Sequence, residues 1–266
     1  MEEKLEYLIV TTGRESIDFV ENMNIKAPTI ITNQANLYSV ELKGKDFMLT
    51  TATRGVGVNR NLGMNLSNAE FSLLVDDDMI FYDNADATII AALEQNEDAD
   101  VIIFNFDYVK NGKFVRTRMK KSERIGKLNC LNYGICCALV RNSKIKQKNI
   151  AFSTLFGGGC KYSCGEDSLF FLDCIRKGLK IYSYAVSIGK NEYRESTWFK
   201  GFDEKFFFDK GAWIACAFPK LKHFIKWYFA IRFGKMTEIP FNKRLALINK
   251  GIKGFYSQYC YENPWD

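Results

Sequence analysis

The chain of 266 residues has little proline, almost no histidine and no long hydrophobic run, with four Pro and one His in all. Its longest apolar stretches, residues 71–75 and 135–140, are far shorter than the roughly 18 residues that a membrane-spanning helix needs. The N-terminal Met1-Glu2-Glu3-Lys4 is acidic, whereas a secretory signal begins with basic residues and continues with apolar ones. We therefore expect a soluble protein of the cytoplasm.

Charge is distributed unevenly along the chain. Residues 1–199 carry 25 basic and 25 acidic side chains, and residues 200–266 carry 12 basic and 6 acidic ones, which accounts for the whole net charge of +6. Large aromatic residues lie between the positive charges of residues 220–235. Such a segment suits contact with nucleic acid, an anionic membrane surface or a phosphorylated ligand, and the simplest alternative is a solvated charged face.

The eight cysteines do not predict a disulfide framework or a metal site. A disulfide-rich fold is typical of small secreted proteins, and this chain is large and has no secretory signal. Cys160 and Cys164 are spaced loosely like metal ligands, but the single histidine, His223, is remote in sequence. We expect reduced thiols that serve as small buried hydrophobic groups.

Strand-like and helix-like segments alternate in the first two-thirds of the chain. The predicted strands are residues 7–11, 29–32, 46–51, 71–75, 101–104 and 180–184, and the predicted helices are residues 16–24, 59–68, 84–94 and 167–177. This alternation predicts an α/β fold with a mainly parallel, doubly wound sheet covered by helices on both faces. Ligands bind such sheets beyond the carboxyl ends of the strands, which is where we place Thr11, Asn33 and the run Asp76-Asp77-Asp78.

Two acidic motifs attract attention. Three adjacent carboxylates are costly unless solvent or a cation neutralises them, and the carboxylates of Asp76 and Asp78, which point to the same side of a strand, suit Mg²⁺ or Mn²⁺. An acidic turn that merely ends a strand is an equally good interpretation. The second motif, Gly165-Glu166-Asp167, opens a predicted helix, where carboxylates favour the helix dipole. Its functional interpretation is a general base held near a reacting hydroxyl.

Together, the motifs resemble those of the family 2 glycosyltransferases with the GT-A fold. That family has an Arg-Asn-x-Gly helix, here Arg60-Asn61-Leu62-Gly63, then a short apolar strand and an Asp-x-Asp, here residues 76–78. Gly165-Glu166-Asp167 resembles the family's acceptor-side motif and lies at the expected distance after the aspartates. The resemblance covers roughly residues 5–215. It implies a GT-A catalytic domain over residues 1–215, with a nucleotide-sugar half (1–110) and an acceptor half (111–215), followed by a basic, aromatic extension over 216–266.

The resemblance also implies roles for individual residues. Asp78 would be the best candidate metal ligand, with Asp76 contacting the metal or the ribose, and the metal would be Mn²⁺ or Mg²⁺. Asp167 would act as the base on the acceptor hydroxyl, assisted by Glu166. The implied nucleotide-sugar contacts are Thr11, Thr12, Arg14, Asn33, Gln34, Arg60, Asp76, Asp77, Ser196 and Lys210. Many members also have a histidine ligand after the Glu-Asp helix, whereas here Asn191, Glu192 or water would have to replace it.

The function expected from the resemblance is an inverting, metal-dependent transfer from a nucleotide-diphospho-sugar, a UDP-sugar, to a glycan acceptor in surface polysaccharide synthesis. The basic, aromatic tail fits a lipid-linked acceptor and peripheral contact with the inner face of an anionic cell membrane. Two alternatives remain. A nucleotidyltransferase shares the sheet and the acidic site but usually has a Gly-rich loop with Arg and Lys after the first strand, which residues 11–14 lack. A module that binds nucleic acid through the tail is disfavoured by the neutral first 199 residues, so we expect no nucleic-acid partner.

Overall fold

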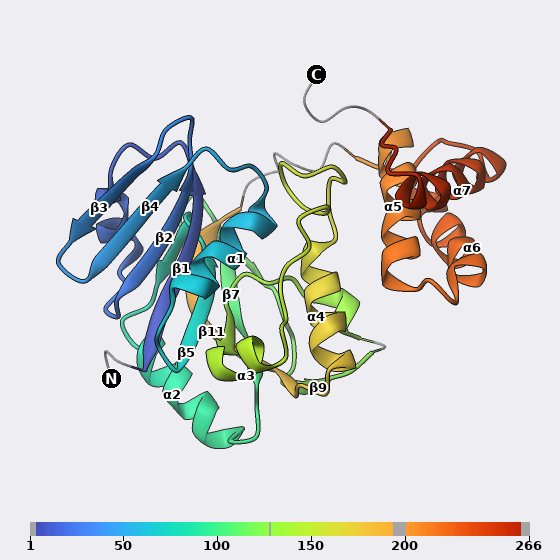
Figure 1. Ribbon diagram of the computed structural model, residues 1–266. Coiled ribbons are helices and arrows are strands. Elements are labelled where there is room, and N and C mark those ends of the chain that lie inside the picture. The colour runs from blue at the N-terminus through green and yellow to red at the C-terminus, as the bar shows by residue number, and fades with distance from the viewer. Residues whose placement is uncertain (1–3, 128, 194–200, 262–266) are drawn as a thin grey trace.

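The computed structural model describes residues 4–127, 129–193 and 201–261 (Figure 1). Within these residues, eleven strands form one sheet in the order β3-β4-β2-β1-β5-β10-β7-β11-β6, with β8 paired to β7 and β9 paired to β11. The strands are β1 (Leu5–Thr12), β2 (Thr29–Gln34), β3 (Ser39–Lys43), β4 (Asp46–Thr51), β5 (Phe71–Asp76), β6 (Met79–Phe81), β7 (Val101–Lys110), β8 (Lys113–Thr117), β9 (Glu123–Ile125), β10 (Ala138–Arg141) and β11 (Ile181–Glu192).

The α/β class is confirmed, and the sheet is mixed in a way that the sequence did not reveal. Strands β4, β2, β1 and β5 are parallel neighbours, and so are β7 and β11. The short strand β10 lies antiparallel between β5 and β7 and joins the two parallel groups. The parallel order brings the carboxyl ends of β1, β2 and β5 to one edge of the sheet.

Helices cover both faces of the sheet, as the continuous apolar strands predict. They are η1 (Ile17–Met23), α1 (Val56–Leu66), α2 (Ala85–Gln95), η2 (Cys130–Asn132), α3 (Asn142–Gln147) and α4 (Glu166–Arg176). Alternate residues of one strand enter different cores: Leu8 of β1 packs with residues of α1 and α4, whereas Tyr7 and Ile9 pack with residues of η1 and α2. This alternation is the period of two that places successive strand side chains on opposite faces.

The last part of the described chain is helical and lies beside α4 (Figure 1). It consists of α5 (Glu204–Ala217), α6 (Lys222–Arg232), η3 (Gly234–Met236) and α7 (Phe241–Tyr256). Helices α5 and α7 approach closely at Gly251, where an added Cβ would collide with the backbone oxygen of Phe208. The expected boundary between 215 and 216 falls in the last turn of α5, so the helical group begins at Glu204, and the division into domains stays a prediction.

Most predicted elements are present, and the clearest differences concern one helix and one strand. The segment predicted as a helix over 16–24 is the 3₁₀ helix η1, whose first turn is capped by Ser16. Strand β3 was not predicted, because its exposed alternating residues carry no buried apolar run. All eight cysteines are free thiols, as expected. Among the described residues, no helix is long and apolar enough to cross a membrane.

Candidate active site

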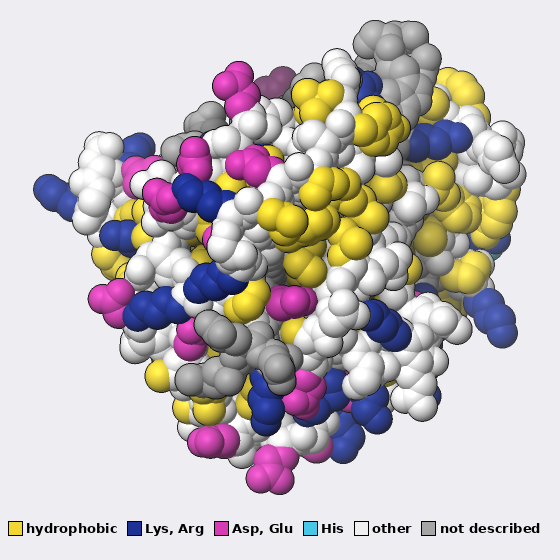
Figure 2. All heavy atoms as spheres, turned by 60° about the vertical axis from the view of Figure 1, so that its left-hand side comes forward, with side chains coloured by type: hydrophobic (Ala, Val, Ile, Leu, Met, Phe, Trp, Pro, Cys, Tyr) yellow, Lys and Arg dark blue, Asp and Glu magenta, His cyan; other side chains and the backbone are white. Residues whose placement is uncertain are grey.

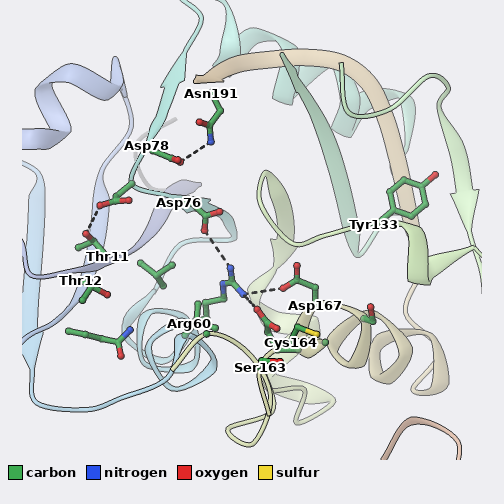
Figure 3. A pocket seen from close by; sticks show the side chains of 18 of the residues that line it. Thr11, Thr12, Arg60, Asp76, Asp78, Tyr133, Ser163, Cys164, Asp167 and Asn191 are labelled. Atoms are coloured by element: carbon green, nitrogen blue, oxygen red, sulfur yellow. Dashed lines mark hydrogen bonds and ion pairs between the residues drawn. The ribbon is translucent and has the colours of Figure 1, made fainter. Parts of the chain in front are cut away.

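A cavity of about 860 Å³ lies where the carboxyl ends of β1 and β5 face the N-terminus of α4 (Figure 3). Residues from both predicted halves line it. They are Val10, Thr11, Thr12, Gln34, Val56, Arg60, Asp76, Asp77, Asp78, Tyr108, Tyr133, Gly158, Ser163, Cys164, Gly165, Glu166, Asp167, Ser168, Asn191, Glu192 and Lys210. The two acidic motifs, about ninety residues apart in the sequence, therefore share one cavity.

Each aspartate of the run has a different partner. Asp76 ends β5 and faces Arg60, with 3.4 Å between Oδ1 and Nη2. Asp77 accepts a hydrogen bond of 2.6 Å from the Thr11 hydroxyl and pairs with the Arg14 guanidinium at 2.9 Å. The carboxylate of Asp78 accepts a bond of 2.8 Å from Asn191 Nδ2. Lost hydration and the nearby charges of Asp76 and Asp77 raise the pKa of Asp78 above its usual value.

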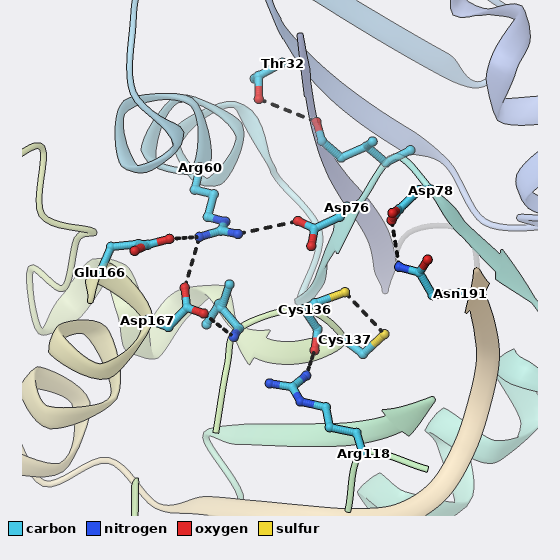
Figure 4. Close-up of polar contacts among 12 residues, drawn as sticks. Thr32, Arg60, Asp76, Asp78, Arg118, Cys136, Cys137, Glu166, Asp167 and Asn191 are labelled. Carbon is cyan, nitrogen blue, oxygen red and sulfur yellow. Dashed lines mark hydrogen bonds and ion pairs between the residues drawn. The ribbon is translucent and has the colours of Figure 1, made fainter. Parts of the chain in front are cut away.

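Arg60 of α1 joins the two acidic motifs (Figure 4). Its side chain is only 8% exposed, and its Nη1 lies 3.2 Å from Oε1 of Glu166 and 3.1 Å from Oδ1 of Asp167. Because Nη2 faces Asp76, one guanidinium contacts a carboxylate at the end of β5 and both carboxylates at the start of α4. The backbone N–H of Ile135 donates to the other oxygen of Asp167 at 3.1 Å, which fixes the orientation of this carboxylate.

Glu166 has an unusual environment for a carboxylate. Burial, followed by the charge of Asp167, raises the pKa of Glu166 to about 7, although the Arg60 cation opposes the shift. Gly165, which precedes it, has a φ of 110° that favours glycine. An added Cβ at Gly165 would collide with the Trp213 ring of α5, whose Nε1 donates to the Gly165 carbonyl at 3.1 Å. The indole therefore holds the first turn of α4, and with it the Glu-Asp pair, at the cavity.

Lys210 extends from α5 into the cavity. Its Nζ lies over the rings of Phe206, Trp213 and Phe229, at 4.9 to 5.4 Å from their centroids. Burial lowers the pKa of Lys210 below its usual value. The aromatic faces attract the ammonium group and hold it in place. The cavity thus receives a fixed cation from the helical group, next to Cys164.

The other residues expected to contact the nucleotide-sugar differ in position. Thr12 and Gln34 line the cavity, and Gln34 Oε1 accepts a bond of 2.8 Å from the N–H of Gly55. Asn33 is fully buried and does not line the cavity; its amide bonds Arg14 and Thr50. It therefore supports the Arg14 loop, and we do not retain it as a ligand contact. Ser196 lies outside the described residues.

The charge balance of the cavity favours a bound cation. Six carboxylates line it, from Asp76, Asp77, Asp78, Glu166, Asp167 and Glu192, against the two cations Arg60 and Lys210. Among the described residues, no three histidine, cysteine or acidic side chains are placed to hold a metal ion by themselves. Asp76 and Asp78 still fit a metal whose remaining ligands are water and phosphate oxygens, as is usual for Mg²⁺. A cation there would relieve the repulsion that raises the pKa of Asp78.

Sequence reasoning gave no role in the site to the polar lining residues Tyr108, Tyr133, Ser163 and Cys164. Tyr133 donates to Glu123 at 2.8 Å, and the Tyr108 ring stacks under the Arg116 guanidinium. None belongs to a motif, since β7 and the loop before α4 reach the cavity only through the tertiary fold. A local signal that could have pointed to this loop is the glycine run 157–159, where a Cβ at Gly157 would collide with the Glu166 carboxyl group.

Comparison with known proteins agrees with this geometry. Residues 36–161 match the family described as Glycosyl transferase family 2. This match supports a family 2 glycosyltransferase. The matched segment contains Arg60 and the aspartate run, and the chain is accordingly an enzyme of the glycosyltransferase class. No curated protein matches the chain in sequence.

Solved structures support the fold of this glycosyltransferase. S. aureus TarS 1-349 in complex with UDP-GlcNAc has a TM-score of 0.58 at 13% identity, covering 96% of this chain and 73% of that one. The same fragment in complex with UDP has a TM-score of 0.58 at 13% identity, over 96% and 72%. Longer S. aureus TarS has a TM-score of 0.55 at 12% identity, over 96% of this chain and 44% of its own. At such low identity the likeness shows the GT-A fold alone.

The family match favours the glycosyltransferase over the nucleotidyltransferase considered from the sequence. The nucleotidyltransferase hypothesis rested on the shared type of sheet, and the family match takes precedence over it. On the face shown in Figure 2, basic and acidic side chains lie around a central hydrophobic area. The absence of a nucleic-acid partner stays a prediction.

Proposed function

We propose that the protein is an inverting, divalent-metal-dependent glycosyltransferase that moves a sugar from a UDP-sugar to a hydroxyl group of a saccharide acceptor. The observation that carries this proposal is the shared cavity, in which the Asp-x-Asp end of β5 faces the Glu-Asp start of α4 through Arg60. A donor with a leaving phosphate needs positive charge, and an acceptor needs a base. In this proposal, a cation held by the Asp-x-Asp side supplies the positive charge, and a carboxylate of the Glu-Asp side supplies the base.

On the donor side, Asp76 and Asp78 would hold Mn²⁺ or Mg²⁺, with Asn191 next to Asp78 as a further oxygen donor. The ion would neutralise the diphosphate, which six lining carboxylates would otherwise repel. Asp77 is engaged with Thr11 and Arg14, so it holds the β1 loop near the nucleotide. The two TarS fragments in complex with UDP-GlcNAc and with UDP support a uridine nucleotide here.

On the acceptor side, Asp167 is the proposed base. Its Oδ2 is oriented by the N–H of Ile135 and its Oδ1 by Arg60, and its carboxylate lines the cavity. Asp167 would accept the proton of the acceptor hydroxyl as that oxygen attacks the anomeric carbon opposite the leaving diphosphate, which inverts the configuration. Glu166 shares the Arg60 cation and assists by holding the pair in place. Lys210 supplies positive charge where the departing phosphate develops negative charge.

We further propose that the acceptor belongs to a surface glycan and is lipid-linked. The motif resemblance and the TarS likeness support a polysaccharide acceptor, and the basic, aromatic C-terminal part supports a lipid anchor on it. Tyr108 and Tyr133 line the cavity and offer ring surfaces to a sugar.

The experiment that tests the proposal measures release of UDP from a panel of UDP-sugars with free and lipid-linked saccharide acceptors. We expect Mn²⁺-dependent release with at least one donor and a drop of about 10³-fold in the Asp167→Asn variant. The Asn variant keeps the size of the side chain and should bind UDP as the natural protein does. Equal turnover by the natural protein and Asp167→Asn would contradict the assignment of the base. If no donor is consumed although UDP binds, the transfer itself would be disproved for this donor class.

A further inference from the structure

Helix α6 exposes a continuous apolar stripe. It consists of Leu221, Phe224, Trp227, Tyr228 and Ile231, which recur at the helical spacing of three and four residues. Phe224 is 77% exposed and Ile231 is 65% exposed, which is unusual for large apolar side chains. Solvent-exposed apolar stripes on a helix mark a surface that another apolar phase or molecule covers.

The opposite side of α6 is already in use inside the protein. Phe229 and Ala230 are buried against the helical group. Lys222 donates to the Tyr256 hydroxyl at 3.1 Å, and Lys226 donates to the Asn249 side chain at 3.0 Å, both on the α7 side. The structure thus fixes the orientation of α6 and leaves the apolar stripe outermost. Lys222 and Lys226, two of the basic residues of the segment 220–235, are therefore engaged within the protein.

Basic residues flank the stripe at both ends of α6. Lys220, Arg232 and Lys235 are exposed next to it, and Arg232 donates to the Tyr228 hydroxyl at 2.9 Å. Residues 220–236 contain five lysines or arginines and no acid. Two copies of this surface would repel each other, so self-association is disfavoured. An anionic surface with an apolar interior matches both the charge and the stripe.

We propose that α6 is a membrane-docking helix that inserts its stripe into the headgroup region of an anionic bilayer. Trp227 and Tyr228 are residue types that prefer this interface, because their rings are apolar and their N–H and O–H groups are polar. Phe224 and Ile231 supply apolar area, and Lys220, Arg232 and Lys235 attract acidic lipid headgroups. The docking surface is separate from the cavity residues and stands independently of the proposed transfer reaction.

The test is co-sedimentation of the full chain with vesicles of phosphatidylcholine alone and with one-third phosphatidylglycerol. We expect binding to the anionic vesicles that weakens at high salt. The double variant Phe224→Ser/Ile231→Ser should lower the partition coefficient at least tenfold, and Lys220→Glu/Lys235→Glu should lower it by a similar factor. A matched control is Val40→Ser/Leu42→Ser on β3, at the other end of the molecule in Figure 1. The two exposed apolar side chains there lie beside Lys43, whose charge is paired with Asp18 and Glu21.

Each outcome decides the proposal. Binding that is lost in the α6 variants and kept in the β3 control supports it. Equal binding by all variants, or no binding to anionic vesicles, overturns it. The other possible occupant of the stripe is a second copy of the chain, which light scattering in solution would detect. A dimer that dissociates in the Phe224→Ser/Ile231→Ser variant would assign the stripe to that second copy instead. UDP binding by the same variants should stay unchanged, so failure of docking is distinguishable from failure of the proposed transfer.

Discussion

The Nη1 atom of Arg60 lies 3.1 Å from Oδ1 of Asp167, so a buried cation on the donor-side helix α1 holds the proposed base of the acceptor side. The same guanidinium faces Asp76 and Glu166. This single residue therefore makes the two acidic motifs one electrostatic unit. Breaking such a buried network by removing the cation leaves carboxylates uncompensated.

Arg60→Met should consequently impair both stability and turnover. We expect a loss of about 3 kcal/mol in the free energy of unfolding, measured by urea denaturation, and a large loss in kcat. Arg60→Lys keeps the charge but loses the forked guanidinium that reaches both motifs. Its stability and turnover should therefore lie between those of the natural protein and those of Arg60→Met. An Arg60→Met variant as stable and active as the natural protein would contradict a network held by this residue.

Glu166 should make stability fall as pH rises between about 4.5 and 7. Its pKa in the folded protein is raised to about 7 by burial, above its usual value of 4.5. The folded protein therefore binds a proton in this range that the unfolded chain has lost, which favours folding at the acidic end. Glu166→Gln should make the fall in unfolding free energy across this pH range smaller by roughly 2 kcal/mol. An unchanged slope in urea titrations at pH 5 and pH 7.5 would disprove the shift.

Lys210 should act on the donor and contribute little to the fold. Its ammonium is buried over three aromatic rings, so Lys210→Met keeps the packing and removes a desolvated charge. We expect unchanged or slightly higher thermal stability together with about tenfold weaker UDP affinity by calorimetry. The exposed Lys250→Met serves as the control. Equal UDP affinity in both variants would contradict a role of Lys210 in UDP binding.

Gly165 should tolerate no side chain. Gly165→Ala would place a Cβ against the Trp213 ring at a φ of 110°, which we expect to cost about 3 kcal/mol of unfolding free energy. Gly178→Ala is the matched control, because its φ is also positive, 86°, but an added Cβ meets nothing within 4 Å. Backbone strain alone should cost it about 1 kcal/mol. Similar losses in the two variants would exclude the Trp213 contact as the cause.

The sequence could predict the strands that carry the site and the two motifs, because both depend on local signals. Buried strands such as 71–75 are short apolar runs, and the aspartates follow directly. The contact between Arg60 and the Glu-Asp pair could not be predicted, since it joins residues more than a hundred positions apart. The burial of Asn33 was missed for a similar reason: its partners Arg14 and Thr50 come from neighbouring strands and loops.

The role of α6 also required the structure. On a helical wheel, Arg232 falls among apolar residues, so the sequence did not separate an apolar face from a charged one. Tertiary packing makes the separation, because Lys222 and Lys226 turn toward α7 and the apolar residues remain outside. Which face of an amphipathic helix is free depends on its neighbours, and periodicity does not reveal it.

The central claim, a metal-dependent UDP site at the end of β5, is tested most directly by calorimetric titration of UDP with and without Mn²⁺, for the natural protein and for Asp78→Ala. Asp78 carries a raised pKa beside two other carboxylates, so a cation should bind there and carry the diphosphate. We predict UDP binding that requires Mn²⁺ and weakens at least a hundredfold in Asp78→Ala. UDP binding of equal strength without Mn²⁺, or in the Asp78→Ala variant, would contradict this site.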